Sequence, residues 1–379
     1  MFLTYYINTN QRPITNQQSI SFDQLFDAQG NLNTLPITPV TNADLPTLQY
    51  RTLQTENLSD HALQYVQRQI STFDQKFRIP LSMYKDQDMH QHYETFKIPK
   101  ASGGLRTINA PSPDLKELLK QIKDFCYRAG ILAHSAAYAY VPGRTAQAAV
   151  TRHIKTKADW YLHLDLHNFF GSCNTMFILS CLNEIPFFRY MPMDLLELLM
   201  HCATLDDGLP QGTPLSPWLT NQLMVQYDYQ IQKACHQIGI TYTRYADDML
   251  FSTKKRDKVL QAKPIVENIL KDTPLQINAQ KTRVSSIYGK NWQLGLMLNQ
   301  HYNATVGTKK KETCRAALQH LCLHPEEYDT ATAREFQGKL AYYIQIEPTY
   351  FNNLIQKYNQ KYNKNIQRLL TTIIKRGHC

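Results

Sequence analysis

Three aspartates lie in segments that are otherwise apolar or β-forming. Asp247 and Asp248 lie in Tyr245-Ala246-Asp247-Asp248, between TYTR and MLFS, and this pattern predicts a β-hairpin over 241–252 with both acids at its tight turn. Asp165 comes near the end of WYLHLDL, whose alternation predicts a strand over 160–166. Paired acids are also common in ordinary turns. The pair alone therefore leaves a turn and a catalytic site both open.

The third acid favours catalysis. A sheet that sets the two segments side by side would bring Asp165 close to Asp247, and carboxylates that close repel unless a cation neutralises them. Hard oxygen ligands of this kind suit Mg²⁺. Two such ions about 4 Å apart are the arrangement that catalyses in-line phosphoryl or nucleotidyl transfer. The acids therefore predict a two-ion magnesium site.

Two further blocks could bind a nucleotide. The stretch from Gly208 to Asn221 is a Pro/Gly-rich loop that leads into a helix, and its backbone amides and the Gln211 carboxamide suit a nucleotide pocket. The stretch IPKASGGLR places Lys100 and Arg106 on a strand pair joined by a Gly-rich turn, where cations could clamp a triphosphate. A rigid loop before a helix and a basic surface hairpin are the plainer alternatives.

The charge balance points to a polyanionic partner. The 379 residues carry 41 Lys and Arg against 31 Asp and Glu, a net charge of +10. Residues 1–60 are acidic, with two basic and five acidic side chains, whereas 309–379 hold twelve basic and six acidic ones. Such an excess suits nucleic acid or an anionic membrane surface. Many basic surfaces bind neither, so charge alone is weak evidence.

Several classes of protein are excluded or disfavoured. The sequence has no apolar run of about 18 residues, and its start lacks the parts of a secretory signal. None of the eight cysteines forms a Cys-x-x-Cys pair, and no paired His/Cys spacing suits zinc. We therefore expect reduced, mostly buried thiols in a cytoplasmic protein that has no contact with a membrane.

The hydrophobic pattern predicts an α+β fold. Residues 1–60 show no lasting period and read as loops and short elements that either stay disordered or pack on the body. Helical spacing, with Ser112 as cap, Pro113 in the first turn and Gly130 beyond the end, predicts a helix between them. Other helices are expected at 59–77, 174–204 and 213–238 and from 308 onward, and a strand–turn–strand at 94–110.

The order of these blocks resembles that of prokaryotic reverse transcriptases. Six segments match consecutive finger and palm motifs of that family: IPKASGGLR, LDLHNFF, LPQGTPLSPWLTN, YADD, INAQKTRV and LGLML. The similarity covers about residues 90–300. It implies a right-hand polymerase with fingers, a palm whose antiparallel sheet bears the YADD hairpin, a helical thumb and an N-terminal extension. The expected parts are 1–60 extension, 61–160 fingers with the start of the palm, 161–300 palm with finger insertions, and 301–379 thumb.

The resemblance assigns roles residue by residue. Asp165 and Asp247 would be the main metal ligands, Asp248 would complete the acidic cluster, and the backbone at Leu166 would face the metal-bound triphosphate. The remaining assignments are triphosphate binding for Lys100 and Arg106, a steric gate against ribose for Phe170, contact with the incoming nucleotide for Gln211, protonation of pyrophosphate for Lys281, and the primer grip for Gly295 and Leu296. Core packing for Phe170 and a plain surface position for Lys281 remain open.

Within the family, the sequence is most similar to retron enzymes. Retron enzymes commonly have Asn-Ala-x-x-His and Val-Thr-Gly elements, where this chain has 149–153, AVTRH, and 293–295, QLG. These departures favour a divergent retron enzyme or another antiphage defence reverse transcriptase. A retron enzyme would bind dNTPs and its structured non-coding RNA, remain bound to the RNA–DNA product, and restrain a separate effector protein. Template-independent or protein-primed synthesis, and an RNA-binding scaffold that no longer polymerises, are the alternatives.

Overall fold

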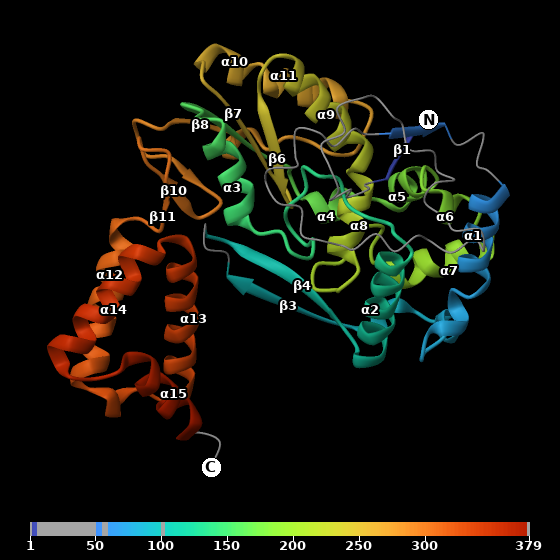
Figure 1. Ribbon diagram of the computed structural model, residues 1–379. Helices are drawn as coiled ribbons and strands as arrows, with labels where there is room; N and C mark the ends of the chain where they lie inside the picture. The colour runs from blue at the N-terminus through green and yellow to red at the C-terminus, as the bar shows by residue number, and fades with distance from the viewer. Residues whose placement is uncertain (1, 6–50, 55–59, 100–102, 377–379) are drawn as a thin grey trace. The chain divides into compact units, whose positions relative to one another are not determined.

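The structure is a computed structural model that describes residues 2–5, 51–54, 60–99 and 103–376 (Figure 1). The chain divides into two compact units. The first comprises 1–145, 162–251 and 257–283, and the second comprises 146–161, 252–256 and 284–379. Near the N-terminus, β1 (Phe2–Tyr5) pairs in antiparallel register with β2 (Arg51–Gln54). The rest of residues 1–60, apart from Asp60, lies outside the described residues.

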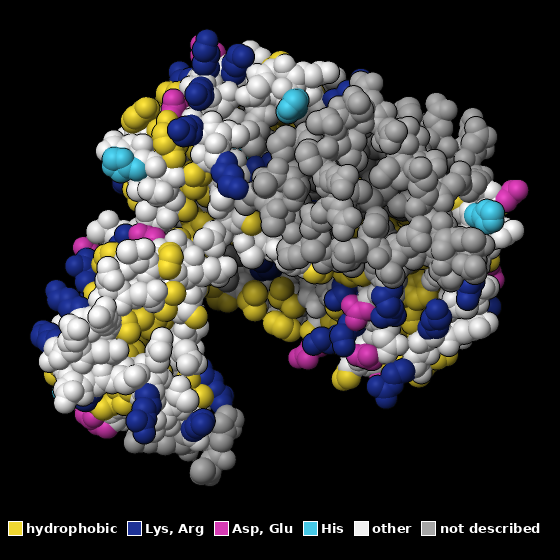
Figure 2. All heavy atoms as spheres, in the orientation of Figure 1, with side chains coloured by type: hydrophobic (Ala, Val, Ile, Leu, Met, Phe, Trp, Pro, Cys, Tyr) yellow, Lys and Arg dark blue, Asp and Glu magenta, His cyan; other side chains and the backbone are white. Residues whose placement is uncertain are grey.

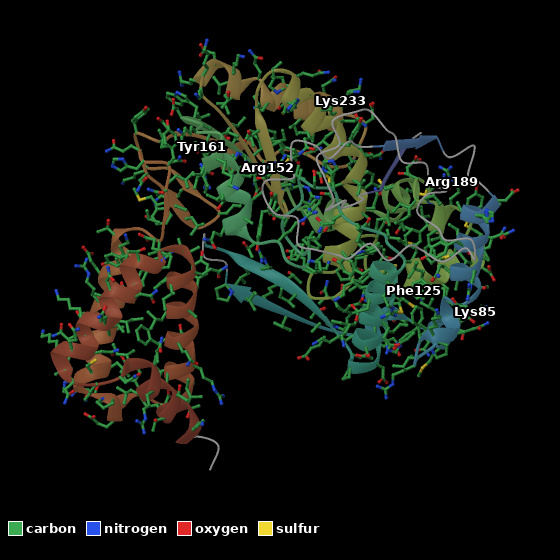
Figure 3. All side chains as sticks on the ribbon, viewed as in Figure 1. Lys85, Phe125, Arg152, Tyr161, Arg189 and Lys233 are labelled. Carbon is green, nitrogen blue, oxygen red and sulfur yellow. The ribbon has the colours of Figure 1, made fainter. Side chains whose placement is uncertain are left out.

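The first unit begins with helices and a two-stranded ribbon. Its elements are α1 (Asp60–Ser71), the 3₁₀ turns η3 (Asp74–Lys76), η4 (Leu81–Tyr84) and η5 (Met89–His92), the antiparallel strands β3 (Tyr93–Pro99) and β4 (Leu105–Pro111), and α2 (Pro113–Arg128). The predicted cap of α2 is confirmed, because the Leu115 N–H donates to Ser112 Oγ. Its predicted apolar stripe is buried. Phe125, labelled in Figure 3, lies there among the rings of Phe73, Phe77 and Phe187.

Short helices follow in the same unit. They are α4 (Phe169–Ser172), α5 (Thr175–Leu182), α6 (Pro186–Arg189), α7 (Met193–Ala203), α8 (Ser216–Leu223), α9 (Val225–Gln237), α11 (Ala262–Leu270) and the turn η6 (Ala279–Lys281). The prediction of a single helix over 213–238 is wrong, because the structure has two helices there. This stretch is divided into α8 and α9 at Met224, whose ψ of −7° departs from the helical value. The α8 helix is buried along most of its length, whereas α9 buries Asp228, Ile231 and Cys235.

A four-stranded sheet carries the predicted acidic motifs. Its order is β6–β7–β5–β8, from β6 (Thr241–Tyr245), β7 (Asp248–Thr253), β5 (Trp160–Asp165) and β8 (Arg283–Ser286). The Leu166 N–H donates to the Asp247 carbonyl over 3.0 Å, and the Asp159 N–H donates to the Thr253 carbonyl over 3.2 Å. These two bonds make β5 and β7 antiparallel. The acids therefore lie at one end of the sheet, and Asp159 and Thr253 lie at the other.

The second unit contains a small sheet and a helical bundle. The sheet has the order β11–β10–β9, from β9 (Trp292–Gln293), β10 (Leu296–Leu298) and β11 (Ala304–Thr305), with α3 (Ala146–Lys155) against β11. The bundle consists of α12 (Thr308–Leu323), the turn η7 (Pro325–Glu327), α13 (Thr330–Ile346), α14 (Pro348–Tyr362) and α15 (Ile366–Arg376). Helices after 308 were predicted, and they are present.

The predicted thiol chemistry holds where it is described. The seven cysteines of the described part of the chain are unpaired and buried. Burial raises the pKa of Cys173 and Cys235 to about 12, so these thiols stay protonated and unreactive. Among the described residues, no helix combines the length and the apolar character that a membrane crossing requires.

A close backbone contact joins the ribbon to the Gln211 loop. The Asn109 N–H in β4 donates to the Gln211 carbonyl over 2.7 Å. Gly212 has φ +126°, and a Cβ there would lie 2.8 Å from the Asn109 carbonyl oxygen and 3.0 Å from Ile108 Cγ2. Neither contact can relax cheaply, because one partner is backbone in a strand. Only glycine allows the loop to approach β4 in this way.

We predict that Gly212→Ala destabilises the protein by about 1–3 kcal/mol, because it adds a backbone clash to an unfavourable φ. Urea unfolding measures the change. The matched control is Gly338→Ala in α13, where a Cβ meets nothing within 4 Å. That change should stabilise by about 0.5–1 kcal/mol, since alanine favours a helix interior. Equal effects of the two substitutions would contradict the close contact.

Candidate active site

The two-residue turn between β6 and β7 is strained. Ala246 has φ +59°, a left-handed conformation that costs a non-glycine residue about 1–2 kcal/mol. Its side chain is only 6% exposed. The neighbouring Asp247 and Asp248 are half-buried at the same turn. The strain persists only if the surroundings hold the turn in place.

A buried ion pair supplies that support. Arg244 and Asp228 are both fully buried, and the guanidinium of Arg244 donates from Nε and Nη2 to the Asp228 carboxylate, with a shortest distance of 2.7 Å. Nη1 of the same Arg244 donates to the Ala246 carbonyl over 3.0 Å. The Tyr242 hydroxyl donates to Asp228 over 2.7 Å. One arginine thus links α9 to the peptide next to Asp247.

The geometry brings Asp165 to the hairpin as predicted. Asp165 is 3% exposed and ends β5, one residue before the Leu166 N–H that bonds to the Asp247 carbonyl. Burial, then the charge of Asp248 and that of Asp165 raise the pKa of Asp247, although its backbone hydrogen bond and Lys281 oppose the shift. The negative charges of Asp165 and Asp248 therefore both act on Asp247.

Nitrogen donors contact two of the three carboxylates. Lys281 Nζ donates to Asp165 Oδ2 over 2.9 Å, and Asn278 Nδ2 donates to Asp165 Oδ1 over 3.2 Å. The bond to Asp165 raises the pKa of Lys281, so this lysine stays protonated. His163 Nε2 lies 2.7 Å from Asp248 Oδ1, across 85 residues of sequence. Each of these two acids is held by a partner from a different element.

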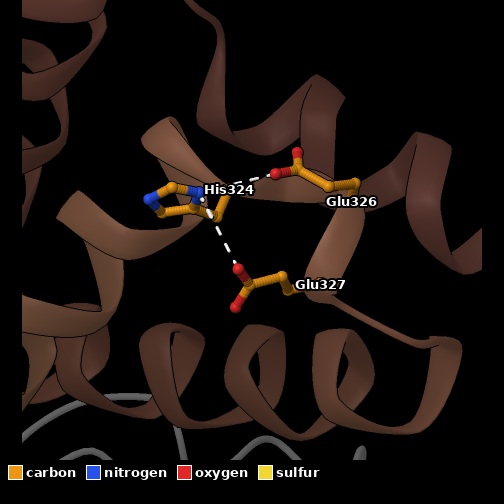
Figure 4. Close-up of side chains that lie close together, drawn as sticks. All are labelled: His324, Glu326 and Glu327. Carbon is orange, nitrogen blue, oxygen red and sulfur yellow. Dashed lines mark ion pairs between the residues drawn. The ribbon is translucent and has the colours of Figure 1, made fainter.

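The donor set fits divalent cations that prefer oxygen. It consists of carboxylates; burial first, and then the charges of Asp248 and Asp165, raise the pKa of Asp247, and a bound cation would oppose both effects. In the described residues, a different trio has ligand atoms all within 4.8 Å of one another: His324, Glu326 and Glu327, shown in Figure 4. These three side chains are exposed and already form ion pairs of 3.5 and 3.8 Å. Exposed groups of this kind are common without a metal.

Aromatic rings lie beside the acids. Phe170, expected as the steric gate, is half-buried and meets Tyr140 edge to face at 6.5 Å between ring centroids. Burial, Asp247 and Tyr245 raise the pKa of Tyr140, and the charge of Arg106 opposes the rise. Tyr140 is therefore within electrostatic reach of both the acids and Arg106. Phe170 therefore contacts a tyrosine whose pKa depends on the charges of Asp247 and Arg106, and the sequence did not single out this tyrosine.

The other expected site residues lie in different parts of the chain. Gln211 lies in the same unit, with its carbonyl bonded to β4. Lys100 lies outside the described residues. Gly295 and Leu296 lie in the second unit, where Leu294 and Gly295 both have positive φ and form a tight turn between β9 and β10. Lys310 Nζ donates to the Gly295 carbonyl over 3.1 Å.

Residues 98–321 match the family described as reverse transcriptase (RNA-dependent DNA polymerase). The chain belongs to this family. It is 26% identical over 291 residues to the retron Mx65 reverse transcriptase of Myxococcus xanthus, a match that covers 73% of this chain and 66% of that one. It is 28% identical over 269 residues to the retron Ec86 reverse transcriptase of Escherichia coli, covering 69% and 79%.

The chain thus spans about two-thirds of the Myxococcus xanthus enzyme's length. A telomerase from Candida albicans, solved with a fragment of telomeric RNA, is similar with a TM-score of 0.42 at 13% identity, covering 82% of this chain and 66% of that one. The α+β architecture, with antiparallel sheets bearing the YADD hairpin, agrees with the right-hand polymerase expected for a reverse transcriptase.

Sequence reasoning missed four residues that hold the acids of this reverse transcriptase: His163, Asp228, Arg244 and Asn278. One signal was available. Asp228 shares a buried helix face with Ile231 and Cys235, at spacings of three and seven residues. An acid on such a stripe requires a cationic partner, and Arg244 interrupts a strand that is otherwise suited to burial. The other two contacts join distant segments and leave no local pattern.

We predict that Asp228→Leu destabilises the protein by about 3–5 kcal/mol, because it leaves the Arg244 charge buried and unpaired. The double variant Asp228→Leu/Arg244→Met removes both charges and should recover most of that stability. It should still lose nucleotide incorporation, because the Ala246 carbonyl then lacks its donor. Urea unfolding and single-nucleotide extension measure the two effects. A stable double variant with unchanged incorporation would show that the pair supports folding alone.

Proposed function

We propose that this chain is an RNA-directed DNA polymerase of the retron type, which copies a structured non-coding RNA into DNA and stays bound to the product. The observation that carries the proposal is the bond between Leu166 and the Asp247 carbonyl, which sets the acid-bearing ends of β5 and the hairpin side by side. It occurs in a chain that belongs to the reverse transcriptase family. The similarity to retron enzymes from two bacteria supports the narrower assignment.

Asp165, Asp247 and Asp248 would hold two Mg²⁺ ions, with the Leu166 backbone facing the triphosphate. Bound there, the ions supply activation of the primer hydroxyl and stabilisation of the leaving pyrophosphate. Lys281 stands 2.9 Å from Asp165 with its proton retained, so it can donate that proton to the pyrophosphate. Arg106 adds positive charge for the triphosphate, and Lys100 is assigned the same role.

Phe170 is proposed to select dNTPs. Its ring is held by Phe169 and Tyr140, with ring centroids 5.9 and 6.5 Å away. The Leu209 N–H also donates to the Phe170 carbonyl over 3.1 Å, so the backbone at this position is tied to the loop before Gln211. A ring fixed in this way can exclude a ribose 2′-hydroxyl from the nucleotide bound at Gln211.

The biological setting is proposed from the same relatives. We propose an antiphage defence role in the bacterial cytoplasm, in which the RNA–DNA product and the enzyme restrain a separate effector protein. Gly295 and Leu296 are assigned to the primer grip, and the bond from Lys310 supports the turn that carries them. The parts expected as extension, fingers, palm and thumb stay as proposed boundaries.

We predict that Asp247→Asn abolishes Mg²⁺-dependent dNTP incorporation on an RNA template, by about a thousandfold or more, since one of the carboxylates that would hold the ions is lost. In mildly alkaline buffer without divalent ions, the same variant should melt at a higher temperature than the parent. The reason is that the raised pKa of Asp247 means the folded state penalises its ionised form, and asparagine removes that charge.

Asp272→Asn, at a side chain that is 87% exposed, is the control and should leave incorporation and melting unchanged. Incorporation that survives in Asp247→Asn would overturn the metal assignment. Purified parent protein that binds RNA but incorporates nothing would favour an RNA-binding scaffold. A product joined to protein at its 5′ end would instead indicate protein priming.

We predict that Phe170→Ala increases the use of rNTPs relative to dNTPs by about ten- to a hundredfold, because the ring no longer excludes the 2′-hydroxyl. Phe170→Tyr keeps the ring and should retain the parent's preference. Steady-state kcat/KM values for the two kinds of nucleotide give the ratio. An unchanged ratio in Phe170→Ala would indicate that this ring only packs.

A further inference from the structure

Cations gather at the end of the palm sheet opposite the three acids. Because β5 is antiparallel to both neighbours, the residues beside Asp159 are Thr253 on one side and Ile287 on the other, bonded over 3.2 and 2.9 Å. Three segments, called loops below, meet there: 155–159, from the last residue of α3 to β5; 254–256, from β7 to the first residue of α10; and 288–290, after β8. All three belong to the second unit. Sheet topology therefore collects segments that are far apart in the sequence.

These loops are basic and exposed. They carry six cations, Lys155, Lys157, Lys254, Lys255, Arg256 and Lys290, which we call the edge cluster, and every member is exposed. The loops contain one acid, Asp159, which accepts a hydrogen bond of 2.7 Å from the Tyr302 hydroxyl, and an exposed second acid, Asp257, directly follows Arg256. None of the six cations forms an ion pair within the described part of the chain. Figure 2 shows dark blue side chains gathered over the α10 (Arg256–Leu260) region.

Aromatic rings accompany the charges. The Tyr288 side chain is 72% exposed between β8 and Lys290, and a buried position would suit such a ring better. Arg256 lies over the Trp160 ring, 5.6 Å from its centroid. Clustered cations with exposed aromatic faces are typical of surfaces that bind nucleic-acid backbones and stack bases. Membrane-surface segments bury an apolar face of several residues beside their cations, whereas these three segments expose a single aromatic ring, Tyr288.

The cluster is too far from the acids to serve polymerisation directly. Asp248 and Thr253 are the two ends of β7, and five steps of about 3.3 Å place them about 17 Å apart. One nucleic-acid strand, at about 3.4 Å per nucleotide, needs about five nucleotides to cover that distance. Nucleic acid held at the edge cluster is therefore separate from the template–primer base pair at which nucleotides are added.

We propose that the edge cluster is a second nucleic-acid site, which binds the phosphodiester backbone of a structured RNA or of its DNA copy away from the catalytic acids. The site provides six positive charges for phosphates and Tyr288 for an unpaired base. The proposal does not depend on polymerisation by this chain. It accounts for part of the excess of positive charge by a surface that the catalytic mechanism does not use.

The test compares two triple variants of the full chain with equal charge loss. Lys254→Gln/Lys255→Gln/Arg256→Gln removes half of the edge cluster. Lys85→Gln/Lys233→Gln/Lys271→Gln removes three exposed lysines from the first unit and is the control; Lys85 and Lys233 are labelled in Figure 3. The probes are an RNA hairpin with a single-stranded tail, the DNA hairpin of the same sequence, and anionic phospholipid vesicles.

We predict that the edge-cluster variant binds the hairpin about tenfold or more weakly than the control variant at moderate salt. Its slope of log affinity against log salt should fall in magnitude by about two to three, because three phosphate contacts are lost. Extension of a short primer–template with no flanking nucleic acid should keep its kcat/KM. If only the affinity for the RNA hairpin falls, the site binds the RNA template. If the affinities for both hairpins fall, the site also binds the DNA copy.

Equal affinity and salt slope in the two triple variants would overturn the proposal. The proposal would also be overturned if the edge-cluster variant bound vesicles more weakly than the control variant but bound both hairpins equally well. If the first triple variant does not fold, Lys155→Gln/Lys157→Gln/Lys290→Gln tests the other two loops with the same charge loss. Tyr288→Ala should weaken binding to the single-stranded tail by about five- to a hundredfold, with the salt slope unchanged. If the variants differ in hairpin binding but the parent protein incorporates no nucleotide, the proposed polymerase function is contradicted and the proposed second site is still supported.

Discussion

The arrangement of the site depends on keeping three mutually repelling carboxylates near one another at the end of a sheet. Two of them follow a left-handed alanine in a two-residue turn, and the third ends the strand that is bonded to that turn. Such a turn is unfavourable for ionised acids, since burial and then the charge of each neighbour raise the pKa of Asp247. The turn stays closed because the Arg244 guanidinium, neutralised by Asp228, holds the Ala246 carbonyl from within the core. The buried Arg244 guanidinium thus positions the acids although it does not contact them.

The same logic explains the nitrogen partners of Asp165 and Asp248. Lys281 and Asn278 both come from the segment that precedes β8, and His163 lies two residues before Asp165 on β5. His163 therefore approaches Asp248 from the neighbouring strand β5, whereas Asn278 and Lys281 approach Asp165 from the turn η6 and its N-cap. Cations that bind the carboxylates would compete with these donors. Lys281 is more than half exposed and can move aside, whereas His163 is nearly buried and keeps its place beside Asp248. The two sides of the acidic group therefore differ in mobility.

The sequence allows the main elements and the three acids to be predicted, because both depend on local patterns. Helical spacing places α2, strand alternation places β5, and acids between β-forming residues mark the hairpin turn. The pairing of β5 with the hairpin has no local pattern of its own, and it is predicted from the need to bring the acids together at one metal site. The contacts of Asp228 with Arg244 and of His163 with Asp248 are not accessible in this way, since they depend on packing between segments 16 and 85 residues apart. The division of the expected 213–238 helix at Met224 depends on packing too.

The antiparallel sheet also determines how charge is distributed over its two ends. The strands β5 and β7 run in opposite directions, so the end of β5 and the start of β7 lie at the same end of the sheet and carry the acids. The start of β5 and the end of β7 lie at the opposite end, where the edge cluster is. A cation of that cluster cannot neutralise the acids from about 17 Å, because that is beyond the Debye length of roughly 8 Å at physiological salt. Counter-ions and water offset these exposed charges when no partner is bound, and a bound polyanion would release those counter-ions. That release favours a polyanion long enough to follow the surface, and the exposed Tyr288 ring could stack with a base of the same strand.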